Sequence, residues 1–358
     1  MKRGPIRVLE LAGDPASRGT IHGSAFAAEI GRYADERLGL AANGSWSGRP
    51  VTSDDVLALA EEMLPHHRRY APDLYEEMMA MAESASISPA EAVVVGGFTD
   101  FVDAVRARGA TDVPEEDDCT AVIVPDADAE GAGFLAQTWD MHDTATEHVV
   151  MLRIQPDDGP EALVFSTVGC LGQIGMNSAG IAIGINNLAA ADGGVAVTWP
   201  FLVRKVLQQR NIDAALEAVM TAPLAGGHNY LLFDGAGHGY NVEAMPTRRS
   251  IEQLDGVPLV HTNHVLDAST RAVEAHRPAD LMDSSEQRLA KAEEILQERP
   301  ITLDLLIALT REPDAICRRS EPPYNNESSG AVIMRPATSE LWACWGVPAD
   351  NEFEHLTL

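Results

Sequence analysis

Apolar residues recur with two different periods along the chain, and the period changes near residue 119. Residues 6–13 alternate as a strand does, whereas residues 16–42 and 53–107 place apolar positions at helical spacing with few β-branched runs. Ser53, followed by two aspartates, and Ser88, followed by proline, are typical N-cap residues of helices. We therefore expect the first third of the chain to be one strand followed by helices.

The stretch at 107–118, ARGATDVPEEDD, interrupts this pattern and contains four consecutive acids. It has little to bury, so we expect an exposed and mobile loop. Beyond it, strand character is found at 119–124, 133–139, 148–154, 162–168, 180–186, 229–262, 331–336 and 340–346. Helical spacing returns only at 199–220 and 284–311. Because helices and strands come in blocks, the pattern predicts an α+β fold and not a doubly wound parallel sheet.

The net charge of the chain argues against some classes of binding partner. Lys and Arg number 26 against 54 Asp and Glu, a formal net charge of −28. Such a field repels nucleic acid and anionic membranes, so we expect neither as a partner. No leader-like apolar stretch and no run of 18 apolar residues occurs, which favours a cytoplasmic protein. The four cysteines include no CxxC pair and are expected to be reduced thiols.

Cys119 is the first candidate for chemistry, because it opens an apolar strand directly after the acidic loop. A thiol in that position can attack the carbonyl group of the preceding residue if the loop is held under strain. Taken alone, the observation is weak, since most buried cysteines act as small apolar residues.

Further motifs follow in order along the chain. They are GDPASRGTIHG at 13–23, Asp118-Cys119-Thr120, Gln137-Thr138-Trp139-Asp140, GMNSAGIAIGINN at 175–187, FDGAGHGYNVEAMPT at 233–247, HTNH at 261–264, AICRR at 315–319 and ELWACWGVPADNEF at 340–353. Together they resemble the acyl-coenzyme A:6-aminopenicillanic-acid acyltransferase-like (C45 peptidase) family of N-terminal-nucleophile hydrolases. The resemblance implies a four-layer αββα sandwich, cleavage of the chain before the cysteine, and a thioester intermediate formed from an amide substrate.

The resemblance also implies roles for individual residues. Cys119 is the nucleophile, and its freed α-amine is the base that accepts the thiol proton, so no cofactor, metal or catalytic histidine is required. Asp140 matches the acid that orients the new ammonium group, and Arg318 matches an arginine that stabilises the thiolate. Asn263 and Asn177 match side-chain donors to the tetrahedral oxyanion.

Cleavage between Asp118 and Cys119 predicts a helical chain, 1–118, and a β-rich catalytic chain, 119–358. We expect the two chains to remain together without a covalent link as one folded domain, with further self-association left open. Two departures from the family pattern stand out. Asp118 replaces the usual glycine, so its negative charge is expected to slow processing. The segment 327–330 lacks the arginine found between Ser and Gly in the acyltransferase, so we expect a different pocket and not penicillin chemistry.

Three alternatives stay open from the sequence. An unprocessed hydrolase would keep Cys119 internal and use His264 or His142 as its base. A metal-dependent hydrolase would use His261 and His264, although their spacing matches no zinc motif. A non-catalytic acidic binding protein would owe its function to the charge alone.

Overall fold

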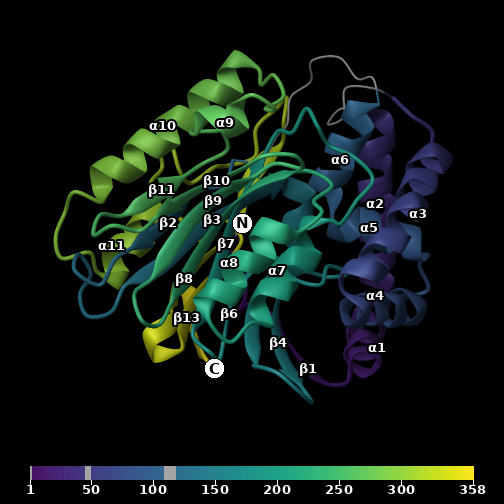
Figure 1. Cartoon of the computed structure of the whole chain (residues 1–358), viewed down its shortest axis with the longest axis horizontal. Helices are drawn as coiled ribbons and strands as arrows, with labels where there is room; N and C mark the ends of the chain where they lie inside the picture. Colours follow the sequence, from purple (N-terminus) through teal and green to yellow (C-terminus); the bar gives the residue numbers. More distant parts are fainter. Residues whose placement is uncertain (1, 45–49, 109–117) are drawn as a thin grey trace.

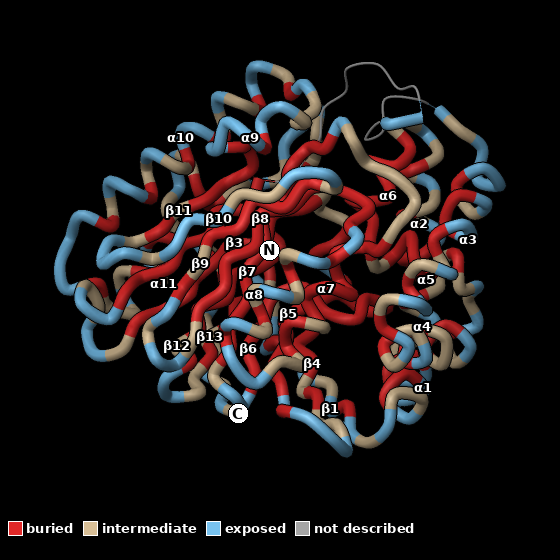
Figure 2. Tube along the Cα trace, in the orientation of Figure 1, coloured by how far each residue is buried: buried red, intermediate tan, exposed pale blue. Residues whose placement is uncertain are grey.

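The computed structural model describes residues 2–44, 50–108 and 118–358 (Figure 1). Two β-sheets lie face to face, and helices cover the outer side of each. Buried chain runs through both sheets, while the helices on the outside are exposed along their outer faces (Figure 2). This arrangement confirms the predicted α+β class and the αββα layering.

The larger sheet, sheet A, has eight strands. In spatial order they are β1 (Val8–Gly13), β4 (Val149–Pro156), β5 (Ala162–Thr167), β6 (Ile174–Asn177), β7 (Ile181–Leu188), β8 (Gly227–Asp234), β9 (Gly239–Ala244) and β10 (Arg249–Gln253). Only the β1–β4 pair is parallel, and it joins the start of the chain to the middle of the sequence. The short strand β6 was not predicted, because its four residues include a glycine and carry too little alternation.

The smaller sheet, sheet B, has six strands. In spatial order they are β11 (Leu259–His261), β2 (Ala121–Val124), β3 (Phe134–His142), β12 (Asn326–Arg335), β13 (Glu340–Trp345) and β14 (Phe353–Thr357). All its pairs are antiparallel. The last strand, β14, was not predicted; it is half-exposed and polar, and its pairing with β13 defines it.

The outer helices divide between the sheets. Helices α7 (Trp199–Leu207) and α8 (Ile212–Thr221) pack on sheet A, whereas α10 (Ala279–Ile295) and α11 (Leu303–Thr310) pack on sheet B. A short helix, α9 (Ala268–Arg271), precedes α10. No helix within the described ranges is both long and apolar enough to cross a membrane.

The first third is helical after β1, as predicted, and its helices form a bundle beside sheet A (Figure 1). Its helices are α1 (Pro15–Ala25), α2 (Ala27–Asn43), α3 (Ser53–Tyr70), α4 (Pro72–Ala85), α5 (Pro89–Gly96) and α6 (Phe98–Ala107). Ser88 caps α5 as expected, but the N-cap of α3 is Thr52 and not Ser53, because Thr52 and Asp55 form a reciprocal capping box. Gly19 and Gly23 bring α1 against α4 so closely that a Cβ at either position would lie within 2.3 Å of a backbone oxygen of α4.

One side chain ties the two sheets together in the middle of the sandwich. The Gln137 amide of β3 bonds both the N–H and the C=O of Ile185 in β7. The approach is tight, since a Cβ at Gly184 would lie 2.8 Å from the Gln137 oxygen. The glutamine in the predicted Gln-Thr-Trp-Asp motif therefore fixes the position of sheet B relative to sheet A.

Candidate active site

Cys119 lies at the junction between the acidic segment and sheet B. Thr120 already pairs with Thr138 of β3, because the Thr138 N–H donates to the Thr120 carbonyl oxygen at 2.9 Å and the Thr120 N–H donates to the Thr138 hydroxyl at 3.1 Å. The Cys119 side chain is buried, and its Sγ lies 3.9 Å from the backbone oxygen of Asp140. The sheet thus holds the nucleophile candidate on a rigid frame.

Two side chains from different layers hold the carbonyl group of Cys119. Asn186 of β7 donates to that oxygen at 3.1 Å, and Arg288 of α10 donates to it at 2.7 Å. The same Asn186 amide also donates to the backbone oxygen of His261 at 3.2 Å. Sheet A, sheet B and α10 therefore meet at this residue.

Asp118 is buried, which corrects part of the prediction for the acidic stretch. We expected residues 107–118 to be exposed; residues 109–117 lie outside the described residues, but Asp118 is only 2% exposed. Its carboxylate meets the guanidinium groups of Arg288 at 3.0 Å and Arg318 at 3.3 Å. Burial opposes ionisation, but the charges of Arg288, Arg318 and Arg277 outweigh it and lower the pKa of Asp118. The departure from glycine is thus accommodated by a cationic site.

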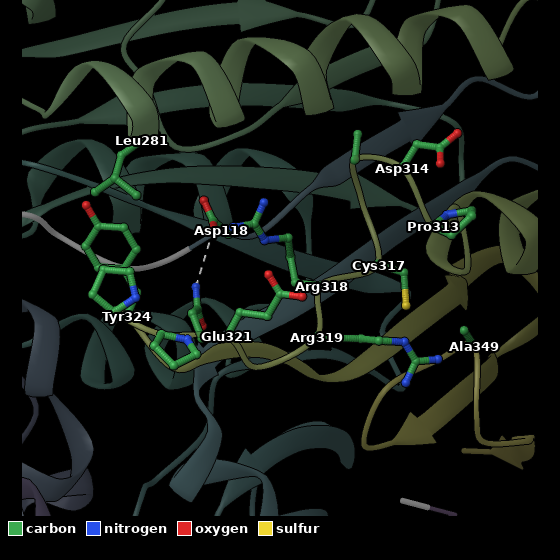
Figure 3. Close-up of a pocket in the computed structure, with 14 residues that line it drawn as sticks. Asp118, Leu281, Pro313, Asp314, Cys317, Arg318, Arg319, Glu321, Tyr324 and Ala349 are labelled. Atoms are coloured by element: carbon green, nitrogen blue, oxygen red, sulfur yellow. Dashed lines mark hydrogen bonds and ion pairs between the residues drawn. The ribbon is translucent and has the colours of Figure 1, made fainter.

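Two weaker polar contacts complete the surroundings of Asp118. The Ser284 hydroxyl lies 3.4 Å from one carboxylate oxygen, and the Asn326 amide lies 3.5 Å from the other. In Figure 3 the Asp118 side chain points toward Arg318 at the inner side of a cavity of about 440 Å³. Tyr324 and Leu281 also line this cavity.

Asp140 is buried in β3, opposite Ser328 of β12. No hydrogen bond of standard geometry reaches either of its carboxylate oxygens from the described part of the chain. Burial therefore raises the pKa of Asp140 to about 7, despite the nearby charge of Arg288 and the Ser328 hydroxyl. A buried carboxylate without compensation can accept a cation that forms beside it.

Asn263 follows β11 by two residues, and β11 pairs with β2, the strand that begins two residues after Cys119. The last pair of this ladder is His261 opposite Ala121. One hydrogen of the Asn263 amide is donated to the Asn187 backbone oxygen at 3.1 Å, and its own Oδ1 is buried without a partner among the described residues. Its second amide hydrogen can therefore serve an oxyanion.

Asn177, the other predicted oxyanion donor, is engaged elsewhere. Its amide donates to the backbone oxygens of Leu207 at 2.9 Å and Gln209 at 2.8 Å, while its Oδ1 accepts from the N–H groups of Ala179 and Ile181. Both donor hydrogens are used to close the β6–β7 turn against the end of α7. These contacts place Asn177 at the β6–β7 turn, against the end of α7.

The two histidines of the unprocessed alternative bond hydroxyl groups of other residues. His264 bonds the Ser285 hydroxyl at 2.8 Å, and burial together with nearby His261 and arginines lowers its pKa to about 4. His142 bonds the Thr144 hydroxyl at 2.8 Å, and burial lowers its pKa as well. For the metal alternative, His261 bonds Glu243 at 3.1 Å, and the described residues contain no group of three ligands placed to hold a metal.

Two arginines at this site were missed from the sequence. Arg288 is fully buried on the inner face of α10, and Arg277 precedes that helix with 4% of its surface exposed. A pattern was available for Arg288: it shares helical spacing with the buried Leu281, Ser285 and Ala292, where an arginine is unexpected. Arg277 lies in a loop segment, where no periodicity could have indicated its burial.

Comparison with known proteins agrees with the motif order. Residues 127–350 match the model of the family described as acyl-coenzyme A:6-aminopenicillanic acid acyl-transferase. The 40 kDa form of acyl-coenzyme A:6-aminopenicillanic-acid-acyltransferase from Emericella nidulans is 26% identical over 262 residues, which cover 71% of this chain and 68% of that protein.

Solved structures show more distant likeness. A mutant of conjugated bile acid hydrolase from Clostridium perfringens is 10% identical, with a TM-score of 0.45 over 67% of this chain and 97% of that one. Penicillin V acylase from Agrobacterium tumefaciens is 11% identical, with a TM-score of 0.38 over 63% of this chain and 82% of that one.

Proposed function

Because the chain belongs to the acyl-coenzyme A:6-aminopenicillanic acid acyl-transferase family, we propose that it is a self-processing cysteine enzyme that hydrolyses or transfers the acyl group of a small amide. Cys119 becomes the N-terminal residue of the chain 119–358 and the nucleophile of the mature enzyme. The observation that carries the proposal is that a single buried side chain contacts groups on both sides of the peptide bond between Asp118 and Cys119. Arg288 donates to the Asp118 carboxylate and to the Cys119 carbonyl oxygen.

Processing starts with attack of the Cys119 thiolate on the carbonyl carbon of Asp118. The C–N bond breaks as the sulfur takes the acyl group, and the nitrogen gains a proton to become an amine. Water then hydrolyses the thioester, which leaves the α-carboxylate of Asp118 and a free Cys119. Removal of the amide creates the base that catalysis needs, because an amide nitrogen does not accept a proton and an amine does.

Turnover uses the same sulfur on an amide substrate. The α-amine of Cys119 takes the thiol proton, and the buried carboxylate of Asp140 supplies the opposite charge for the ammonium group. Asn263 donates to the oxyanion as the carbonyl becomes tetrahedral. The leaving amine takes a proton from the ammonium group, and water or an amine acceptor then attacks the thioester.

The contacts between 1–118 and 119–358 support a stable pair of chains after cleavage. Strand β1 pairs with β4 over six residues. The Asp103 carboxylate of α6 accepts from the N–H groups of Ala190 and Gly227, and Asp100 accepts from that of Trp199 at 2.5 Å. These buried bonds keep the helical chain in place without a covalent link.

Denaturing mass spectrometry of the purified protein tests the proposal. We expect two polypeptides, 1–118 and 119–358, in the active protein and a single uncleaved chain without activity for Cys119→Ala. Cys317→Ala is the matched control, because Cys317 is a buried thiol that lines the cavity beside Asp118; it should be cleaved normally. An active protein that consists only of the full-length chain would contradict self-processing and favour the internal Cys–His alternative.

A further inference from the structure

Among the described residues, the side chains that contact the Asp118 carboxylate lie on the other side of the proposed cleavage point. Arg288 and Arg318 pair with the Asp118 carboxylate, and Ser284 and Asn326 lie at 3.4 and 3.5 Å from it. All four belong to the chain 119–358. The carboxylate of the first chain therefore occupies a ready-made anion site of the second.

Three arginines act on the Asp118 carboxylate. A second buried carboxylate, that of Asp140, also interacts with Arg288 and Arg318. Arg277 is buried, with only 4% of its surface exposed, and none of its three guanidinium nitrogens has a hydrogen-bond partner within the described ranges. It lies close enough to lower the pKa of Asp118. Buried cations without partners are costly, so withdrawal of Asp118 after cleavage would leave the buried Arg288 and Arg277, and the partly exposed Arg318, without this carboxylate.

The covalent structure of the precursor defines the position of that anion relative to the carbonyl carbon that Cys119 attacks. The carboxylate of Asp118 is joined through Cβ and Cα to the carbonyl carbon that Cys119 attacks. The precursor is thus an amide whose acyl group carries a carboxylate, separated from the scissile carbonyl carbon by two carbon atoms. Since the same sulfur must reach the carbonyl carbon of the substrate, the same carboxylate position becomes available to a substrate in the mature enzyme.

We propose that the mature enzyme selects amides of dicarboxylic acids of the succinyl type, whose distal carboxylate takes the place of the Asp118 side chain between Arg288 and Arg318. This inference rests on the proposed function. The cavity of about 440 Å³ beside the site leaves room for substituents of the acyl chain next to Tyr324 and Leu281. The reaction itself is unchanged: the acyl–nitrogen bond breaks, the amine leaves with a proton, and water regenerates the thiol.

Binding can be tested without turnover. In Cys119→Ala the uncleaved chain keeps Asp118 in the site, whereas Cys119→Ala combined with Asp118→Gly leaves the site open. Calorimetry should detect binding of acetate, which replaces only the carboxymethyl group that Asp118→Gly removes, to the double variant only, and a 10- to 100-fold weaker binding of acetamide, which lacks the charge. Asp118→Ala in the same background replaces Asp118→Gly if the glycine variant does not fold. Equal binding of acetate to the uncleaved Asp118 protein and to the open variant would overturn the proposal.

Turnover assays distinguish recognition of the substrate's acyl group from recognition of its amine group. The processed enzyme should cleave N-succinyl p-nitroanilide about 10- to 100-fold better in kcat/KM than N-butyryl p-nitroanilide. A carboxylate on the amine, as in N-butyryl p-aminobenzoate, should bring no gain. A preference that follows the amine carboxylate, or none at all, would overturn the inference, while cleavage of the neutral amides would still uphold the proposed function.

Arg318→Gln distinguishes recognition from a general effect on the thiolate. We expect the preference for succinyl over butyryl to fall below threefold, mostly through KM, whereas loss of thiolate stabilisation lowers both substrates equally. Arg319→Gln is the matched control, because Arg319 adjoins Arg318 but pairs with Asp350 at 2.7 and 2.8 Å. Its preference should be that of the parent enzyme, and an unchanged preference in Arg318→Gln would contradict the proposal.

Discussion

Two groups of buried charges lie in this molecule, and they are compensated very differently. In the bundle, Glu77 of α4 lies between Arg18 of α1 and Arg204 of α7, and all three are at most 3% exposed. Its carboxylate accepts from Arg18 at 2.7 and 2.9 Å and from Arg204 at 2.8 and 3.1 Å. The remaining donors reach the backbone oxygens of Gly13 and Leu171.

Around Cys119 the charges are equally buried but poorly paired. Asp140 and Arg277 have no hydrogen-bond partner of standard geometry in the described part of the chain, and Arg288 divides its donors between Asp118 and the Cys119 carbonyl oxygen. Although burial opposes ionisation, Arg204 and Arg18 lower the pKa of Glu77, whereas burial prevails at Asp140 and raises its pKa. Saturated pairing is typical of a structural cluster, and incomplete pairing leaves groups available for chemistry.

The largest effect is expected from breaking the saturated cluster. Glu77→Gln removes the acid that lies between Arg18 and Arg204 and leaves two buried cations. Loss of one partner of a buried ion pair costs about 3–5 kcal/mol, so the free energy of unfolding should fall by that amount. Urea denaturation in the Cys119→Ala background measures it on a single uncleaved chain. A loss below about 1 kcal/mol, the value typical of an exposed ion pair, would show that this cluster is no more structural than the one at Cys119.

A second comparison sets two asparagines against each other. Asn263→Ala should lower turnover by about 10²–10³-fold with the fold retained, because a donor to the oxyanion is lost. Asn177→Ala should destabilise the fold but leave the turnover of folded, processed enzyme within threefold, since both of its donors hold a turn. Steady-state kinetics and thermal unfolding of both variants check this. The reverse result would indicate that Asn177, and not Asn263, donates to the oxyanion.

The pH dependence of stability should differ between the clusters. In the uncleaved Cys119→Ala chain, Asp140 has a pKa of about 7 against 3.8 in the reference state. The folded chain then holds more protons between pH 4 and 7, so this residue makes stability fall as pH rises through that window. Asp140→Asn should therefore stabilise the uncleaved chain at pH 8 by a few kcal/mol at most and leave it unchanged at pH 4, because one pKa unit equals about 1.4 kcal/mol.

For Glu77 the pH dependence of the free energy of unfolding has the opposite sign. Its lowered pKa means that it contributes stability above the unfolded value of 4.5, and that this contribution is lost as pH falls toward the folded value. Unfolding free energies measured from pH 3 to 8 should show Asp140→Asn rising above the parent as pH increases from 4 to 8, and Glu77→Gln approaching the parent as pH falls below 4.5. Parallel curves would mean that the two carboxylates have the same surroundings in solution.

The smallest effect is expected from His264→Ala. The histidine has a pKa of about 4, so it is neutral near pH 7, and it bonds Ser285. We expect turnover to change by less than about tenfold and cleavage to proceed. Loss of activity comparable with that of Asn263→Ala would instead support a histidine base.

The sequence by itself was sufficient for the class of fold and for the nucleophile candidate. The change from helical to alternating spacing at Cys119 is a local property of the chain, and the same residues form α1 to α6 on one side and β2, β3 and their neighbours on the other. Capping of α5 by Ser88 is equally local, because donor and acceptor are three residues apart. Strands β6 and β14 are defined by their pairing with neighbouring strands, and their sequences contain too little alternation to predict them.

Only the tertiary structure decided how charge is distributed around the site. Arg288 and Asp118 are 170 positions apart in sequence, yet they form a buried ion pair at 3.0 Å. Asn263 and Asn177 both lie in motifs that resemble the family, but their surroundings differ. Asn263 follows β11, which pairs with β2, whereas Asn177 closes the β6–β7 turn. Such differences depend on which groups are desolvated together, and desolvation is set by packing between layers and not by the order of residues.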